Sequence, residues 1–145
     1  LTNVGPLGSS VKYIQCPMGY SYSNMLLGNR NQIIKIFAIL ADINNYTIIY
    51  HCNIGTDRTG LISFLVNGLV GVPEKSLYRD YLMSNFGDIG GKRSISDIKG
   101  IYLDYVKGFD GITLSKKIYN CLESLGVPAE NLDSVINIMK TQKAA

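Results

Sequence analysis

The strongest hydrophobic pattern lies in the middle of the chain. Residues 59–70 (TGLISFLVNGLV) are apolar almost all round, which is typical of a helix buried inside a domain. Upstream of it, five apolar residues recur at helical spacing: Ile33, Ile36, Phe37, Leu40 and Ile43. This period predicts an amphipathic helix over residues 30–43, which the asparagine pair that follows should end.

Two short segments have the character of β-strands. Residues 11–16 (VKYIQC) alternate along their length and stop at Pro17, which predicts a short strand. Residues 46–51 (YTIIYH) are dense in β-branched and aromatic side chains, which predicts a buried strand. The order strand, helix, strand indicates an α/β layout with a parallel pair of strands. Because two strands make a thin sheet, we expect further strands outside this chain.

The second half of the chain predicts helices. One begins at Pro73, and a glycine-bearing loop over residues 87–92 separates it from a helix around residues 98–105. Thr113 is the expected N-cap of the next helix, and Pro128 opens the last one.

Composition limits the class of protein. A chain of 145 residues is one domain's worth, so we take residues 1–145 as a single domain. With 46% hydrophobic and 17% charged residues it has the balance of a globular protein. A net charge of +3 does not predict a nucleic-acid partner, and no run of apolar residues is long enough to predict a transmembrane helix.

The cellular compartment stays unassigned. Three cysteines do not make a disulfide framework, so the reducing cytoplasm is the default. No signal peptide is visible. The chain begins with Leu1 and not with Met, which leaves processing and secretion open.

The candidate chemistry is concentrated in residues 51–60 (HCNIGTDRTG). Cys52 follows the expected second strand, and Arg58 stands where the next helix begins. A loop in this place turns backbone N–H groups inward, and together with the helix dipole they bind a tetrahedral dianion. Arg58 adds a planar, two-pronged grip on phosphoryl oxygens. The same field lowers the pKa of Cys52 and makes its thiolate a nucleophile for phosphorus.

HCNIGTDRTG resembles the His-Cys-x5-Arg-Ser/Thr signature of protein tyrosine phosphatases, and most closely the bacterial and fungal branch with HCxxGxDRTG. Residues 71–85 (GVPEKSLYRDYLMSN) and 122–139 (LESLGVPAENLDSVINIM) extend the resemblance. Members of this branch act on phosphotyrosine, sometimes with dual specificity for phosphoserine and phosphothreonine, and in some cases on phosphoinositides. The implied fold is a mostly parallel central sheet flanked by helices.

Family members also carry an N-terminal Arg-Asp-Leu-Gly-Gly motif and further strands. This chain shows no such stretch. We therefore expect it to be the C-terminal part of a larger domain, lacking part of the N-terminal strands, or else a strongly abbreviated relative.

The resemblance assigns roles to single residues. It makes Cys52 the nucleophile that forms a phosphocysteine intermediate, Arg58 the ligand of the phosphoryl group, and Asp57 the general acid. Thr59 supplies the hydroxyl that supports the thiolate, and His51 orders the loop. The implied two-step hydrolysis uses no metal and no cofactor. The phosphate cradle is formed by residues of the loop: Asn53, Ile54, Gly55, Thr56 and Arg58.

Some of these assignments have competitors. Asp42, or a residue outside this chain, is the alternative acid, and pairing with a neighbouring cation is the alternative role of Asp57. Residues 92–93 (Lys-Arg) either contact substrate or belong to a solvated loop, and residues 84–85 either order water near the site or end a helix. Cys16 either packs locally or forms a disulfide with the catalytic cysteine.

The predicted activity is hydrolysis of phosphotyrosine, on a protein or on a phosphorylated small molecule. Thr56 stands where phosphoinositide-preferring members often carry a lysine, which favours phosphotyrosine. A phosphoinositide or inositol-phosphate phosphatase of the same mechanism is one alternative, and a non-catalytic phosphate-binding module is the other. In each case the loop is expected to hold a phosphate or sulfate ion.

Overall fold

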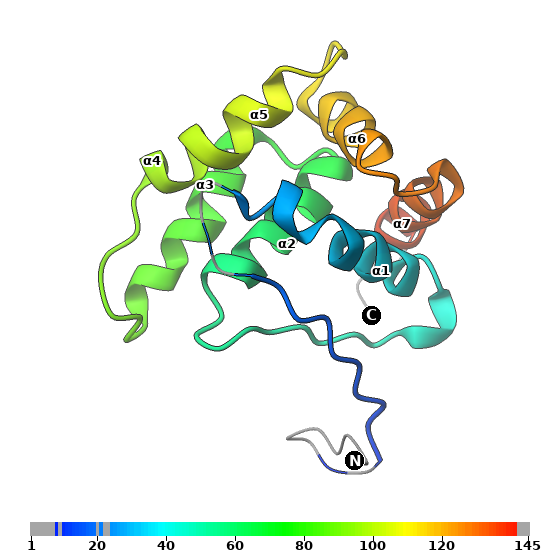
Figure 1. Cartoon of the computed structure of the whole chain (residues 1–145), viewed down its shortest axis with the longest axis horizontal. Helices are drawn as coiled ribbons and strands as arrows, with labels where there is room; N and C mark the ends of the chain where they lie inside the picture. The colour runs from blue at the N-terminus through cyan, green and yellow to red at the C-terminus, as the bar shows by residue number, and fades with distance from the viewer. Residues whose placement is uncertain (1–7, 9, 20, 22–23, 142–145) are drawn as a thin grey trace.

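Helix α2 (Asp57–Leu69) is the central element of the fold, and the other long helices are arranged around it (Figure 1). The computed structural model describes residues 8, 10–19, 21 and 24–141. Most side chains of α2 are buried, and Leu61, Leu65 and Leu69 have no exposed surface. This confirms the helix that the apolar run of residues 59–70 predicted.

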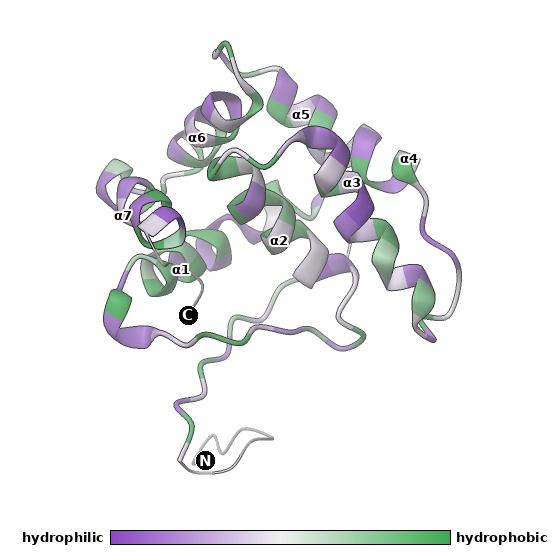
Figure 2. Ribbon diagram, turned by 180° about the vertical axis from the view of Figure 1, so that it is seen from behind, coloured by the Kyte–Doolittle hydropathy of each residue, from purple (hydrophilic) through white to green (hydrophobic). Residues whose placement is uncertain are grey.

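The remaining helices cover α2 and each other. Helix α2 packs against α3 and α6, α1 packs against α7, and α5 packs against α6. Figure 2 shows hydrophobic and hydrophilic residues alternating along α6 and α7, as expected of amphipathic helices that bury one face. The bounds of the helices, in chain order, are α1 Arg30–Leu40, α3 Glu74–Met83, α4 Ile95–Ile98, α5 Asp104–Lys107, α6 Leu114–Ser124 and α7 Ala129–Thr141.

Short helical turns connect or extend several of these helices. The predicted helix over residues 98–105 is part of a longer helical stretch, in which a π-helical segment, η5 (Lys99–Leu103), joins α4 to α5. The 3-10 turns are η2 (Leu27–Asn29), η3 (Ile43–Asn45) and η4 (Ser84–Phe86).

Two helix boundaries show how local hydrogen bonds set the ends. Helix α1 ends at Leu40, earlier than predicted, because Asp42 is the N-cap of η3 and accepts a hydrogen bond from the backbone N–H of Asn44 at 2.9 Å. Helix α6 has the predicted N-cap, since the Thr113 hydroxyl accepts from the backbone N–H of Lys116 at 3.2 Å. The Asp42 carboxylate is therefore engaged in capping η3.

The predicted α/β fold with a parallel central sheet is wrong for this structure. No residue within 8, 10–19, 21 and 24–141 lies in a β-strand. Residues 11–16 and 46–51 have no regular secondary structure, apart from turns and bends at their edges, and form no ladder with each other. A strand exists only where its backbone pairs with a neighbouring strand, and β-propensity alone does not provide that partner.

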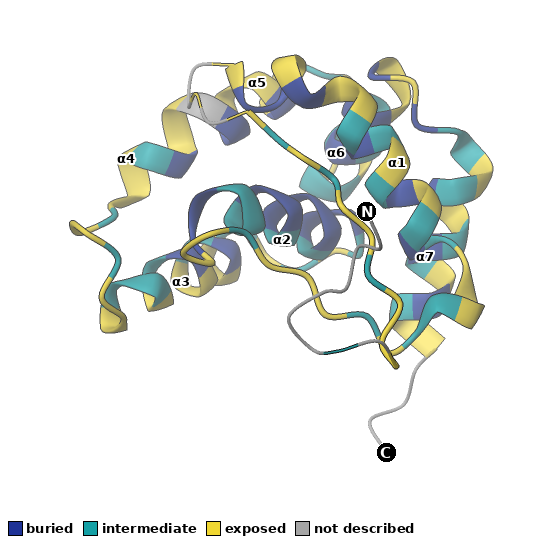
Figure 3. Ribbon diagram, turned by 60° about the horizontal axis from the view of Figure 1, so that its bottom comes forward, coloured by how far each residue is buried: buried dark blue, intermediate teal, exposed yellow. Residues whose placement is uncertain are grey.

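Side-chain contacts hold the first of these segments in place. Lys35 of α1 donates to the carbonyl oxygen of Gln15 at 2.9 Å, and Lys12 donates to Oδ1 of Asn45 at 3.0 Å. The expected burial of the second segment is also wrong, because Ile49 is 75% exposed. Figure 3 shows the contrast between the buried α2 and the exposed segment that leads into it.

The hydrophobic core is continuous from α1 through α2 to α7. Its fully buried members include residues of each of these helices and of α6: Ile33, Phe37, Leu61, Leu65, Ile118, Leu122, Leu132 and Val135. Among the described residues, no helix combines the length and the hydropathy that crossing a bilayer requires. The core fixes α2, and α2 in turn fixes the loop at its N-terminus.

Candidate active site

The loop of residues 52–56 connects the extended segment to the N-terminus of α2. Gly55 has a φ of +74°, a conformation that glycine adopts without a steric penalty, and the chain turns there. Thr56 is the N-cap residue and is only 1% exposed, and its carbonyl oxygen accepts a hydrogen bond from the N–H of Gly60 at 2.7 Å. Residues 53–55 are exposed. Backbone N–H groups of this loop are therefore available at the positive end of the α2 dipole.

Cys52 lies at the start of this loop and is partly buried. Burial raises the pKa of its thiol, but the Thr59 hydroxyl and the backbone N–H groups of Thr59, Gly55 and Ile54 stabilise the thiolate and lower the pKa from 9.0 to about 7. The buried Thr59 hydroxyl has no partner within ordinary hydrogen-bond limits in the described part of the chain. The hydroxyl therefore stabilises the thiolate without meeting the geometry of a full hydrogen bond. Cys52 carries substantial thiolate at neutral pH, as a nucleophile requires.

Arg58 lies on the first turn of α2, and part of its guanidinium has no hydrogen-bond acceptor among the described residues. Its Nη1 donates to the carbonyl oxygen of Met18 at 3.4 Å, which is a weak hydrogen bond. Its Nε is buried and has no hydrogen-bond partner among the described residues. A buried guanidinium N–H without an acceptor is unfavourable, so this donor indicates a place where an anionic oxygen would be stabilised.

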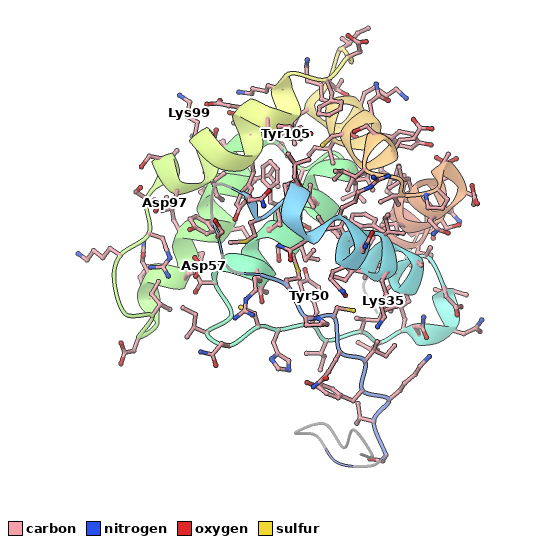
Figure 4. All side chains as sticks on the ribbon, in the orientation of Figure 1. Lys35, Tyr50, Asp57, Asp97, Lys99 and Tyr105 are labelled. Atoms are coloured by element: carbon pink, nitrogen blue, oxygen red, sulfur yellow. The ribbon has the colours of Figure 1, made fainter. Side chains whose placement is uncertain are left out.

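Asp57 forms an ion pair that the sequence did not locate. Its carboxylate is 2% exposed and accepts two hydrogen bonds from Arg93, from Nε to Oδ1 at 2.9 Å and from Nη2 to Oδ2 at 3.1 Å. Residue 93 therefore contacts the loop residue that was expected to serve as acid. Figure 4 shows Asp57 at the start of α2, on the same side of the molecule as Asp97 of α4.

The neighbouring His51 is exposed, and its Nδ1 lies 2.9 Å from the carbonyl oxygen of Cys52. In the tautomer that carries hydrogen on Nδ1, the ring donates to that carbonyl. This contact supports a role in ordering the loop. Asp42, the competing acid, is engaged at η3 and does not line the cavity beside Cys52.

A cavity of about 740 Å³ opens beside the loop. It is lined by residues 11–18 and 47–53, by apolar side chains of α1, and by Arg58 and Thr59 of α2. Cys52 faces the same cavity. The nucleophile candidate, the guanidinium and the hydroxyl are thus brought to one surface by α2 and the segment before it.

The structure also places the other two cysteines. Cys16 lines the cavity, yet all three cysteines have free thiols, so the alternative of a disulfide is absent here. Burial raises the pKa of Cys16, although the charge of Lys35 opposes it, and burial raises the pKa of Cys121 to about 12. Cys52 is therefore the cysteine with a thiol prepared for ionisation.

Sequence reasoning missed a tyrosine that packs against the first turn of α2. Tyr81 of α3 is 4% exposed, and a Cβ on Gly60 would lie 3.1 Å from its ring. Burial raises the pKa of its hydroxyl, and the charges of Asp57 and Asp97 add to this effect. The sequence predicted a helix that begins at Pro73 but did not indicate that Tyr81 on it would meet α2.

Comparisons with known proteins agree with the geometry. The model of the tyrosine phosphatase family matches residues 9–142. A protein of Nostoc commune named tyrosine-protein phosphatase is 31% identical over 67 residues, which cover 46% of this chain and 23% of that protein. No solved structure gives a significant match. The family model spans nearly the whole chain, including the Cys52 loop, so the resemblance seen in HCNIGTDRTG is confirmed. The chain belongs to the tyrosine phosphatase family.

Proposed function

We propose that this chain carries the catalytic loop of a cysteine-dependent phosphatase that hydrolyses phosphotyrosine. The observation that carries the proposal is the Cys52 thiol, with a pKa of about 7, at the N-terminus of α2. Arg58 supports it, because its buried Nε has no acceptor among the described residues. A thiolate beside unused positive donors suits attack on a phosphate monoester better than it suits a structural role.

In the first step, the Cys52 thiolate attacks phosphorus and the bond from phosphorus to the tyrosyl oxygen breaks. Asp57 must first release one carboxylate oxygen from Arg93 and take up a proton; it then donates that proton to the tyrosyl oxygen, so the leaving group departs as a neutral phenol. Backbone N–H groups of residues 53–58 and the guanidinium of Arg58 stabilise the phosphoryl oxygens in the transition state. The product is a phosphocysteine on Cys52.

In the second step, water attacks phosphorus and the sulfur leaves as a thiolate. Asp57 takes up a proton of the water, which restores its first state, and inorganic phosphate is released. Thr59 supports the leaving thiolate through its hydroxyl. For either proton transfer, one oxygen of the Asp57 carboxylate must separate from Arg93, because both oxygens accept from Arg93 in this structure.

The loop favours a singly phosphorylated substrate. Thr56 is 1% exposed and uncharged, and Arg93 is paired with Asp57, so neither adds a free positive charge beside Arg58. A phosphoinositide headgroup with several phosphates needs more than one such charge. We therefore place phosphotyrosine ahead of phosphoinositides.

The test is phosphate release from a phosphotyrosine peptide and from a soluble phosphoinositide, measured with the parent protein and with Cys52→Ser. We expect a higher kcat/KM on the peptide and no turnover in Cys52→Ser, since a serine hydroxyl is a far weaker nucleophile at neutral pH. The matched control is Cys121→Ser, a variant of the buried cysteine that lies away from the loop.

Each outcome bears on a different part of the proposal. Turnover by Cys52→Ser within tenfold of the parent would remove Cys52 as nucleophile. An equal or higher kcat/KM on the phosphoinositide would overturn the substrate preference. Phosphate binding without any turnover by the parent would identify a phosphate-binding module instead of an enzyme.

A further inference from the structure

The ion pair between Asp57 and Arg93 joins two parts of the chain that are 36 residues apart in sequence. Asp57 is the first residue of α2, and Arg93 closes the glycine-bearing loop that precedes α4. The two side chains are 2% and 14% exposed. Both carboxylate oxygens accept from the guanidinium, which is the strongest and most directional form of this interaction.

The backbone of Arg93 is fixed as firmly as its side chain. Oδ1 of Asn85 accepts from the N–H of Arg93 at 2.6 Å, and Nδ2 of Asn85 donates to the carbonyl oxygen of Arg93 at 2.8 Å. In addition, Nη1 of Arg93 donates to the carbonyl oxygen of Gly91 at 3.0 Å. Asn85 thus holds the backbone of the loop from which the Arg93 guanidinium reaches Asp57.

The charge of Asp57 poses a problem for an anion site. The negative carboxylate is buried next to Arg58, in the loop that is proposed to hold a phosphate dianion. Like charges in a site of low dielectric repel each other, and an unpaired buried carboxylate is unfavourable in itself. Arg93 supplies the opposite charge at hydrogen-bond distance from both oxygens.

We propose that Arg93 is a positioning residue that fixes the Asp57 carboxylate and cancels its charge, so that the loop of residues 52–58 accepts a phosphate dianion. This inference rests on the proposed function only in so far as the loop binds phosphate. It assigns Asn85 and Arg93 a part in the site, although they lie outside the signature motif.

The experiment is calorimetric titration of the protein with inorganic phosphate at fixed pH and ionic strength. Arg93→Met should weaken phosphate binding by about tenfold or more, because one partner of a buried charge pair is removed and the Asp57 charge is left uncompensated. Arg93→Lys keeps the charge without the two-pronged geometry and should fall between Arg93→Met and the parent. Arg79→Met removes an exposed arginine from α3 and should bind like the parent.

The decisive variant is the double substitution Asp57→Asn with Arg93→Met. It removes both charges, so phosphate binding should recover to within about threefold of Asp57→Asn alone, whereas two independent effects would add. Such recovery also shows that the loss in Arg93→Met is not a folding defect, and thermal unfolding of each variant checks this directly.

The outcomes separate this inference from the proposed function. If the variants bind phosphate with the affinities predicted above but the parent shows no turnover, the proposed enzyme activity is wrong and the Arg93 inference holds. If the parent shows turnover but the effects of Asp57→Asn and Arg93→Met on phosphate affinity are additive, the inference is wrong and the proposed enzyme activity holds. The same conclusion follows if Arg93→Met binds phosphate like the parent. A parent that binds no phosphate at millimolar concentration overturns both.

Discussion

Replacing Thr59 by valine tests the electrostatics of the site without relying on any enzyme activity. Valine keeps the shape of threonine and removes the hydroxyl, which heads the groups that lower the pKa of Cys52 from 9.0 to about 7. A full hydrogen bond to a charged group contributes about 1.5–3 kcal/mol, equivalent to about one to two pKa units, and this is an upper limit here because the Thr59 hydroxyl does not meet hydrogen-bond geometry. Because Cys52 is only partly buried, solvent screens the interaction and we take about one unit. The pKa of Cys52 should therefore rise from about 7 to about 8.

The assay is the rate of alkylation by iodoacetamide as a function of pH, with the modified peptides identified by mass spectrometry. Only the thiolate reacts, so the rate climbs with pH and its midpoint reports the pKa. At pH 7, about half of Cys52 is thiolate in the parent and about a tenth in Thr59→Val, a roughly fivefold loss of rate. Thr59→Ser keeps the hydroxyl and should react like the parent.

Cys16 is an internal control for this measurement. It lines the same cavity as Cys52, but burial raises its pKa, so its peptide should stay slow in every variant. A Cys52 midpoint that remains at about 7 in Thr59→Val would refute the role of the hydroxyl and leave the backbone N–H groups as the cause of the low pKa.

Further predictions concern Arg58 and the packing of α2. Arg58→Lys should lower kcat/KM by about 10² or more, because a point charge does not replace the two-pronged donor. The control, Arg79→Lys on the exposed face of α3, should leave kcat/KM unchanged. A loss below threefold in Arg58→Lys would mean that Arg58 has a structural role. Gly68→Ala should destabilise the fold by about 1–3 kcal/mol in chemical denaturation, because its Cβ would overlap with the fully buried Ile118. Gly100→Ala has open space around its Cβ and should instead be stabilising by up to about 1 kcal/mol, so equal effects of the two alanines would contradict the packing described here.

The position of the candidate site was predictable from the sequence, because it depends on residues that are close together in the chain. The cysteine, the arginine and the turn glycine lie within residues 52–58, and α2 begins at Asp57, one residue before the predicted start. Burial raises the pKa of Cys52, and the donors that lower it all lie within residues 54–59. A motif of this kind determines its own local geometry once a helix follows it.

The partners of the site were not predictable in the same way. The ion pair of Asp57 with Arg93 and the contact of Gly60 with Tyr81 join α2 to α3 and to the loop before α4. The sequence offered two interpretations of Asp57, as acid or as partner of a cation, and only the packing of these elements identified the cation. No local pattern indicates which distant residue will come within hydrogen-bond distance.

The same difference between local and long-range interactions explains why the predicted helices are present and the predicted strands are not. The sequence alone determined α1, α2 and α6, because a helix closes its hydrogen bonds between residues four positions apart and its apolar period is visible in the chain. Residues 11–16 and 46–51 have strand-like composition, but a strand needs a partner backbone from elsewhere. The tertiary structure gives these two segments no ladder, and they line the cavity beside Cys52 instead, because backbone pairing between distant segments depends on where the whole fold places them.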